Sequence, residues 1–264
     1  MPDAFTLVWK SVVLGIVEGL TEFLPVSSTG HLILAGHFLE FGSPELEIFI
    51  QVGAMLALTW CYRVRLLGIA RDLPREPKTQ GLVLKVLLAF LPAAVVGLAA
   101  HHWIEEHLFN PSFVATALAV GGVLLILIDR GDRPAVGKEL EDLTWGQALA
   151  VGVGQTLSLL PGVSRSASTI VAGLLAGLDR RAATDFSFLL ALPTLYAASL
   201  YALWSARDRI DQHMVIAMGV GLVAAYVSAL VVINAFLRYV QTNTLRPFGW
   251  YRIVLGAALL YWLR

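Results

Sequence analysis

Two apolar regions of this chain, residues 5–41 and 145–178, repeat each other at a fixed offset of 137 residues. The matched positions are Gly15 with Gly152, Glu18 with Gln155, Leu20 with Leu157, Thr21 with Ser158, Val26 with Val163, Ser27 with Ser164, Ile33 with Ile170 and Ala35-Gly36 with Ala172-Gly173. Each region is interrupted by proline, at Pro25 and at Pro161, so each predicts a helix–break–helix hairpin. An internal repeat of this kind predicts two halves with the same fold.

The rest of the chain is apolar enough for a membrane. Hydrophobic residues make up 57% of its 264 positions and charged residues 14%, against about 25% charged in soluble domains. Six uninterrupted apolar runs have roughly the 20 residues that a bilayer crossing needs. They lie near 45–62, 82–103, 112–129, 183–204, 214–236 and 249–263. The zero formal net charge gives no indication of a nucleic-acid partner, and the single Cys61 excludes an intrachain disulfide.

The number of crossings sets the relation between the two halves. Each half contains one hairpin followed by three spans, and three crossings invert the second half relative to the first. Irregular backbone at membrane depth is tolerated only where it lines protein or a wet cavity, which favours hairpins that turn back inside the bilayer. The sequence therefore predicts an all-α integral membrane protein, with six transmembrane helices plus two re-entrant helix hairpins arranged as an inverted repeat. The repeats are residues 1–136 and 137–264, joined by a solvated loop at 129–143.

Basic residues in the loops predict the orientation. The 63–80 loop carries Arg63, Arg65, Arg71, Arg75 and Lys78, and the 129–143 loop carries Arg130, Arg133 and Lys138, whereas 104–110 has no lysine or arginine. The positive-inside rule places the basic loops in the cytoplasm. Both termini then face outside, the first hairpin enters from the outer face and the second from the inner face, so that their tips meet. Lys85, Asp185 and Arg252 are expected at membrane edges.

The first hairpin contains an acidic pair in an apolar helix. Glu18 and Glu22 are four residues apart, which places both carboxylates on one helix face. Two such groups in a poorly hydrated setting share a proton or bind a cation. Carboxylate and hydroxyl oxygens are hard ligands, so we expect a divalent cation, Mg²⁺ or Ca²⁺, held by Glu18 and Glu22.

A hydroxyl-rich turn follows the acidic pair. Ser27, Ser28 and Thr29 precede Gly30 and His31 at the start of a second helix, where backbone amides attract anions. Helix capping explains one hydroxyl but not three. We therefore expect Ser27 and Thr29 to bind substrate and His31 to donate a hydrogen bond to a phosphate oxygen or to move a proton.

The second tip reads PGVSRSAST from Pro161 to Thr169, and Arg165 is its one strongly basic group. A guanidinium in this setting needs an anion and suits phosphate. The alternative is an internal ion pair with Glu18 or Glu22, which is compatible with a ligand-free state. The remaining expected substrate-binding residues of this tip are Gly162, Ser164, Ser166 and Thr169.

The segments EGLTEFLPVSSTGH at 18–31 and PGVSRSAST at 161–169 closely resemble the two signature regions of the bacterial undecaprenyl-pyrophosphate phosphatases associated with bacitracin resistance. The resemblance extends to FSFLLALP at 186–193. It implies an enzyme of the bacterial plasma membrane that removes the terminal phosphate of a polyprenyl pyrophosphate lipid, with a site open to the periplasmic side. It also implies catalytic roles for Glu18, Glu22, Ser28, His31 and Arg165. A homodimer is compatible with the sequence.

Two questions stay open at this point. Either Ser28 attacks the terminal phosphate after Glu22 or His31 removes its proton, or Glu22 activates a water molecule and Ser28 only positions the phosphate. The inverted repeat by itself also fits a transporter or flippase of a lipid-linked or anionic substrate.

Overall fold

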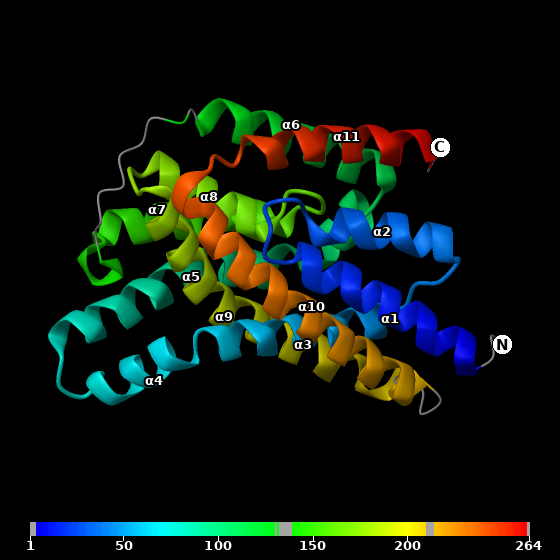
Figure 1. Cartoon of the computed structure of the whole chain (residues 1–264), viewed down its shortest axis with the longest axis horizontal. Coiled ribbons are helices and arrows are strands. Elements are labelled where there is room, and N and C mark those ends of the chain that lie inside the picture. Colours follow the sequence, from blue (N-terminus) through cyan, green and yellow to red (C-terminus); the bar gives the residue numbers. More distant parts are fainter. Residues whose placement is uncertain (1–3, 130, 132–138, 210–213, 263–264) are drawn as a thin grey trace.

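The computed structural model describes residues 4–129, 131, 139–209 and 214–262, and all regular elements in these ranges are helices (Figure 1). The first half contains α1 (Ala4–Thr21), α2 (Ser28–Leu39), α3 (Pro44–Cys61), α4 (Arg63–Asp72), α5 (Pro77–Leu108) and α6 (Pro111–Ile128). The second half contains α7 (Trp145–Thr156), α8 (Arg165–Leu175), α9 (Arg180–Ala206), α10 (Val215–Thr242) and α11 (Arg246–Trp262). Short 3₁₀ turns are Leu140–Asp142, Leu157–Leu159 and Arg207–Arg209. The predicted all-α class is confirmed, while the predicted repeat boundary at 136/137 lies outside the described residues.

Within the described ranges, four helices are long and apolar enough to cross a bilayer: α5, α6, α9 and α10. A fifth span is possible if α3 and α4 are counted together, although they meet at an angle of 66°. The sixth predicted span corresponds to α11, whose 17 residues are at the short end of what a crossing requires. The structure therefore supports a multi-pass membrane protein with four or five long crossings.

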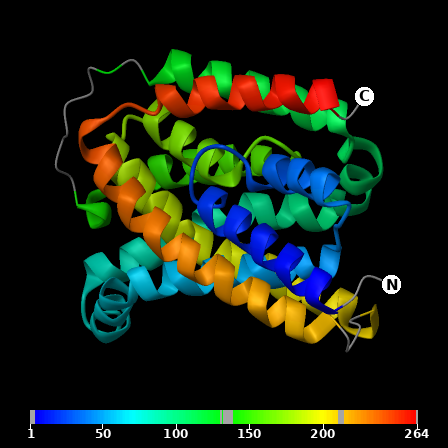
Figure 2. The same ribbon diagram turned by 45° about the vertical axis from the view of Figure 1, so that its right-hand side comes forward.

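The most extensive helix packing joins the two halves, and smaller contacts lie within each half. α1 lies along α10, α7 lies on α5, and α6 runs beside α11 (Figures 1 and 2). α3 contacts both α9 and α10. Each hairpin is thus supported by a long helix from the opposite half of the chain.

Glycines make these contacts unusually close. A Cβ atom added to Gly15 of α1 would lie 2.2 Å from the carbonyl oxygen of Gly221 in α10. On the other side, Cβ atoms on Gly122 and Gly249 would lie 2.5 and 2.6 Å from each other's carbonyl oxygens, joining α6 to α11. Small residues that allow close backbone approach are the usual basis of helix association in lipid.

Helices α3 and α9 cross where two repeat-related residues meet. The hydroxyls of Thr59 and Tyr196 lie 2.8 Å apart, and the two residues are separated by 137 positions. Below the hairpins, the apolar core is built from aromatic side chains such as Phe23, Phe188 and Phe236, with the Phe23 and Phe188 ring centres 5.5 Å apart.

Two expected loops are partly helical. The 63–80 segment begins with α4, and α5 continues past Pro92 to Leu108 and ends just before Asn110-Pro111. Asn110 caps α6 by accepting a hydrogen bond from the Phe113 N–H at 2.9 Å. The expected basic residues Arg130, Arg133 and Lys138 lie outside the described residues.

Arg252, which is expected at a membrane edge, has a fully buried side chain. Among the described residues, the hydrogen-bond acceptors of its guanidinium are all backbone carbonyls. Lys85 is also buried, and its ammonium donates to the carbonyl of Glu141 at 2.8 Å, which compensates for its burial. Asp185 accepts a hydrogen bond from the Tyr62 hydroxyl at 2.7 Å.

Candidate active site

Two serines cap the second helices of the hairpins in the same unusual conformation. Ser27 precedes α2 with φ 69°, and Ser164 precedes α8 with φ 76°. Their hydroxyls accept hydrogen bonds from the N–H groups of Gly30 at 3.5 Å and Ala167 at 3.3 Å. Non-glycine residues with positive φ are strained and cluster at functional sites. Each strained cap places the residue after it, Ser28 or Arg165, in the first turn of its helix.

The acidic pair keeps its helical spacing although α1 ends between the two residues. Glu22 lies one residue beyond Thr21, the end of α1, and its N–H still donates to the Glu18 carbonyl at 2.9 Å. Both side chains are buried. The two carboxylates therefore enter the site from successive turns, as the sequence predicts.

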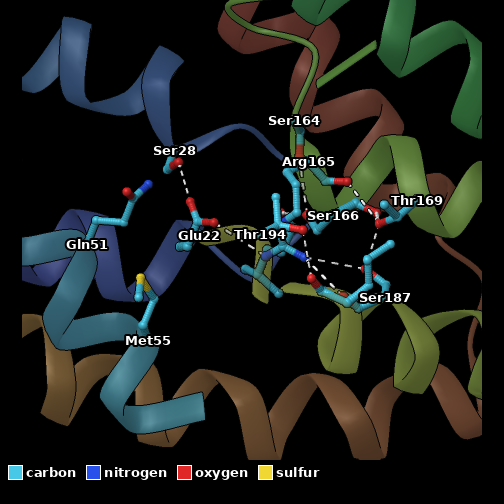
Figure 3. A network of polar contacts seen from close by, with 12 residues as sticks. Glu22, Ser28, Gln51, Met55, Ser164, Arg165, Ser166, Thr169, Ser187 and Thr194 are labelled. Atoms are coloured by element: carbon cyan, nitrogen blue, oxygen red, sulfur yellow. Dashed lines mark hydrogen bonds and ion pairs between the residues drawn. The ribbon is translucent and has the colours of Figure 1, made fainter. Parts of the chain in front are cut away.

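Glu22 connects the two hairpin tips (Figure 3). Its Oε2 accepts a hydrogen bond from the Ser28 hydroxyl at 2.7 Å, and its Oε1 lies 3.3 Å from Nη2 of Arg165. The side chains of Glu22 and Arg165 are only 6% and 8% exposed, so the ion pair is shielded from water. The alternative of an internal ion pair is thus observed, with Glu22 as the partner, and the tips meet.

Arg165 is weakly bound by its protein partners. Besides Glu22, its Nη1 donates to the carbonyl and the hydroxyl of Ser187, both at 3.4 Å, and its guanidinium lies 5.8 Å from the centre of the Phe23 ring. These hydrogen bonds are at the long end of the normal range. Within the part of the chain that the structure describes, its buried Nε has no partner. A buried, incompletely paired guanidinium suits an anion with several oxygens, such as phosphate.

Two of the predicted substrate-binding residues, Ser166 and Thr169, also hold the tips in place. The Ser166 hydroxyl donates to the carbonyl of Leu24 at 2.7 Å, which joins the second tip to the first. The Thr169 hydroxyl lies 2.6 Å from that of Ser187 and donates to the Arg165 carbonyl at 2.9 Å. Ser187 is a site residue that sequence reasoning missed, although it lies within the FSFLLALP segment.

The remaining predicted residues differ in their surroundings. The Ser164 hydroxyl also lies 3.1 Å from that of Ser166, and Thr29 is half-buried in the first turn of α2. Gly162 has φ +89° and lies against α6, where a Cβ would come within 2.5 Å of the Val114 carbonyl oxygen. Only glycine fits this position, because both the conformation and the space exclude a side chain.

His31 points away from the Ser28–Glu22 pair. Its Nδ1–H donates to the carbonyl of Ser27 at 2.7 Å, and its Nε2 lies 2.7 Å from the hydroxyl of Tyr251 in α11. Among the described residues, no hydrogen bond joins His31 to Ser28 or Glu22. The group in position to accept the Ser28 proton is therefore Glu22.

The acidic pair fits a cation in part. The buried Glu18 carboxylate accepts no hydrogen bond from a described residue, and it lies close enough to Glu22 for the two charges to interact. Such a carboxylate needs a proton or a cation. No cluster of three histidine, cysteine, aspartate or glutamate side chains forms around it in the described ranges. Glu18 and Glu22 could thus supply two oxygen ligands, and other ligands would come from substrate and water, which is the usual arrangement for Mg²⁺.

These features define a class of protein: a helical, multi-pass membrane protein in which two hairpin tips present a hydroxyl, a carboxylate and a guanidinium for phosphate chemistry. The sequence profile of the family described as "Bacitracin resistance protein BacA" matches residues 11–258. The chain belongs to this family.

Curated relatives agree with this assignment. The chain is 44% identical to an undecaprenyl-diphosphatase of Ectopseudomonas mendocina over 257 residues, which cover 96% of this chain and 93% of the relative. It is 46% identical to undecaprenyl-diphosphatase 2 of Rhodospirillum rubrum, with 95% and 93% covered. It is 43% identical to an undecaprenyl-diphosphatase of Bordetella petrii, with 100% and 99% covered.

Proposed function

We propose that this protein hydrolyses undecaprenyl pyrophosphate to undecaprenyl phosphate and inorganic phosphate, which recycles the lipid carrier of cell-wall synthesis. The observation that carries the proposal is the contact between Ser28, Glu22 and Arg165 across the two tips. Family membership and the names of the relatives support the choice of substrate.

The geometry favours Ser28 as the nucleophile. As its oxygen attacks the terminal phosphorus, Glu22 accepts the hydroxyl proton, and the bond from that phosphorus to the bridging oxygen breaks. Undecaprenyl phosphate leaves with the bridging oxygen and its electron pair and takes the proton from Glu22, which leaves Glu22 ionised. Glu22 then accepts a proton from a water molecule as the water oxygen attacks the phosphoserine. The bond from phosphorus to the Ser28 oxygen breaks, inorganic phosphate is released, and Glu22 returns the proton to the Ser28 oxygen.

Arg165 would hold the terminal phosphoryl group during both displacements. Its long hydrogen bonds and its unpaired Nε leave donors for phosphate oxygens, whose charge redistributes in the transition state. Ser187 and Thr169 keep the guanidinium in place. A divalent cation bound by Glu18 and Glu22 would neutralise charge on the pyrophosphate.

We also propose the membrane arrangement that the sequence predicts: six spans with two re-entrant hairpins related as an inverted repeat. The cross-packing of α1 on α10 and of α7 on α5 supports it, as does the meeting of Thr59 with Tyr196. The beginning of α1 and the end of α11 lie at one end of the molecule and the arginine-bearing α4 at the other (Figures 1 and 2). With α4 in the cytoplasm, the site opens to the outer side and the polyprenyl tail leaves between helices into the outer leaflet.

The decisive experiment uses purified protein in detergent micelles with undecaprenyl pyrophosphate. Release of inorganic phosphate is expected, with undecaprenyl phosphate as the second product. Micelles contain no second compartment, so a transporter or flippase without hydrolase activity would release none. That outcome would overturn the proposal.

A further inference from the structure

Helix α11 inserts a fully buried arginine behind the two hairpin tips. The guanidinium of Arg252 donates four hydrogen bonds, all to backbone carbonyls: Gly162 at 3.1 Å, Leu118 at 3.2 Å, and Pro25 and Ala117 at 3.3 Å. In the described ranges no carboxylate forms an ion pair with it. Its position is therefore set by backbone groups and not by a counter-charge.

Two of the four carbonyls belong to the chain breaks that create the site. Pro25 lies in the first break, three residues before Ser28, and Gly162 lies in the second break, three residues before Arg165. A single rigid, planar group thus bonds to both chain breaks, in each case three positions before the residue expected to act on phosphate, Ser28 or Arg165. The separation of the tips depends on where this guanidinium lies.

The guanidinium is itself held by α6. Ala117 and Leu118 of α6 accept its other two hydrogen bonds, and Gly121, one turn further, makes room for it. A Cβ on Gly121 would lie only 2.2 Å from Nη2 and 2.8 Å from Cζ of Arg252. Because α6 and α11 are joined closely at Gly122 and Gly249, they form a firm base for the side chain.

We propose that Arg252 is a positioning residue that fixes the distance between the two hairpin tips, and thereby aligns Ser28 and Glu22 with Arg165 for phosphoryl transfer. The inference rests on the proposed function. Arg252 touches neither the Ser28–Glu22 pair nor Arg165, so it acts through the backbone of the tips. Misplacement of reacting groups by about 1 Å can cost about 100-fold in rate, which makes such a role measurable.

The central variant is Arg252→Lys, which keeps the charge but cannot bond to four carbonyls in a plane. We expect kcat to fall about 10- to 100-fold while KM changes less than about threefold. Arg180→Lys is the matched control, because the Arg180 side chain is only 12% exposed but binds Asp129 and the Gly131 carbonyl, and not the two chain breaks. The control is expected to lower Tm and leave kcat unchanged.

Gly121→Ala tests the same role without altering Arg252. The added methyl group displaces the guanidinium, so this variant should also lower kcat with little change in KM. It therefore tests the role of Arg252 even if Arg252→Lys does not fold. The proposal would be overturned if neither Arg252→Lys nor Gly121→Ala lowers kcat more than Arg180→Lys does. A raised KM with unchanged kcat would also overturn it, because that result indicates direct substrate binding.

Distance measurements separate this inference from the proposed function. Leu20 and Leu157 are exposed, repeat-related residues near the two breaks and accept spin labels in a Cys61→Ser background. Arg252→Lys should broaden or shift the distance distribution between the labels, and Arg180→Lys should not. An unchanged distribution in Arg252→Lys contradicts the positioning role even if the wild-type protein hydrolyses no substrate.

Discussion

Ser28 and Glu22 are joined by a 2.7 Å hydrogen bond, although the break that ends the first helix of the hairpin separates them. The carboxylate faces the hydroxyl and is shielded from bulk water, so it competes for the proton without a solvent intermediary. This contact predicts that Glu22 is the general base of the reaction.

Glu22→Gln removes the proton acceptor and preserves the size of the side chain. We expect kcat to fall about 10²- to 10⁴-fold, the usual contribution of a general base. Phosphate release from undecaprenyl pyrophosphate measures it, with Glu105→Gln as the control, since Glu105 is exposed at the end of α5. Activity within threefold of wild type would exclude Glu22 as the base.

Ser28→Ala distinguishes a nucleophile from a positioning hydroxyl. If Ser28 forms the covalent intermediate, substrate labelled in its terminal phosphate should leave acid-stable label on the wild-type protein and none on Ser28→Ala. The exposed Ser112 provides the control variant, Ser112→Ala, which should be labelled normally. Substantial turnover by Ser28→Ala would instead favour a water molecule activated by Glu22.

Arg165→Lys tests the phosphate-binding role without leaving Glu22 unpaired. An alanine at this position would strand a buried carboxylate, at a cost of about 3–5 kcal/mol, and confuse folding with catalysis. Lysine keeps the charge but loses the planar donors, so we expect kcat/KM to fall about 100-fold or more. The exposed Arg181→Lys should behave as wild type. Near-normal kcat/KM in Arg165→Lys would argue against a direct contact with phosphate.

The cation is tested through Glu18, which has no hydrogen-bond donor among its described neighbours. Mg²⁺ or Ca²⁺ should raise the Tm of the substrate-free wild-type protein. Glu18→Gln should raise the cation concentration that half-saturates this effect about tenfold or more. Chelation should reduce wild-type phosphate release. If neither the Tm nor the activity changes when a cation or a chelator is added, the mechanism does not use a metal ion.

The strained cap at Ser164 predicts a difference between two small substitutions. Ser164→Ala loses the cap and keeps an unfavourable positive φ, whereas Ser164→Gly loses the cap and relieves the strain. We expect the alanine variant to be less stable by about 1 kcal/mol or more. Equilibrium unfolding in mixed micelles measures the difference, and equal stabilities would show that the backbone strain has little cost.

Much of the site could be predicted because its residues are charged, whereas the segments around them are apolar. Glu18, Glu22 and Arg165 are charges inside apolar helical segments, and the fixed offset between the two hairpins indicates that their tips belong together. The contact of Glu22 with Arg165 confirms that expectation. The hydrogen bonds of Ser166 to Leu24 and of Thr169 to Ser187 could not be predicted, since a hydroxyl's partners depend on tertiary contacts that sequence spacing does not specify; that Ser166 and Thr169 bind substrate stays a prediction.

The supporting residues were missed for a related reason. The sequence predicts a membrane-edge position for Arg252, a lone cation in an apolar run, but it does not predict the burial of this side chain. The reason is that its partners are backbone carbonyls, which carry no signal in the sequence. Ser187 and Tyr251 resemble ordinary helix residues until the fold brings them to Arg165 and His31. Helix ends were also hard to predict, because α5 extends through the polar residues that follow the predicted span 82–103 and ends at Leu108.

The exchange of helix partners between the halves also has a consequence for biogenesis. α1 leaves the ribosome first, yet the helix that it packs along, α10, is among the last to be made. Until then the first hairpin lacks its main support, and Glu22 has no arginine to balance it before α8 is synthesised. The active site can therefore be completed only late in synthesis, after both α8 and α10 have been inserted.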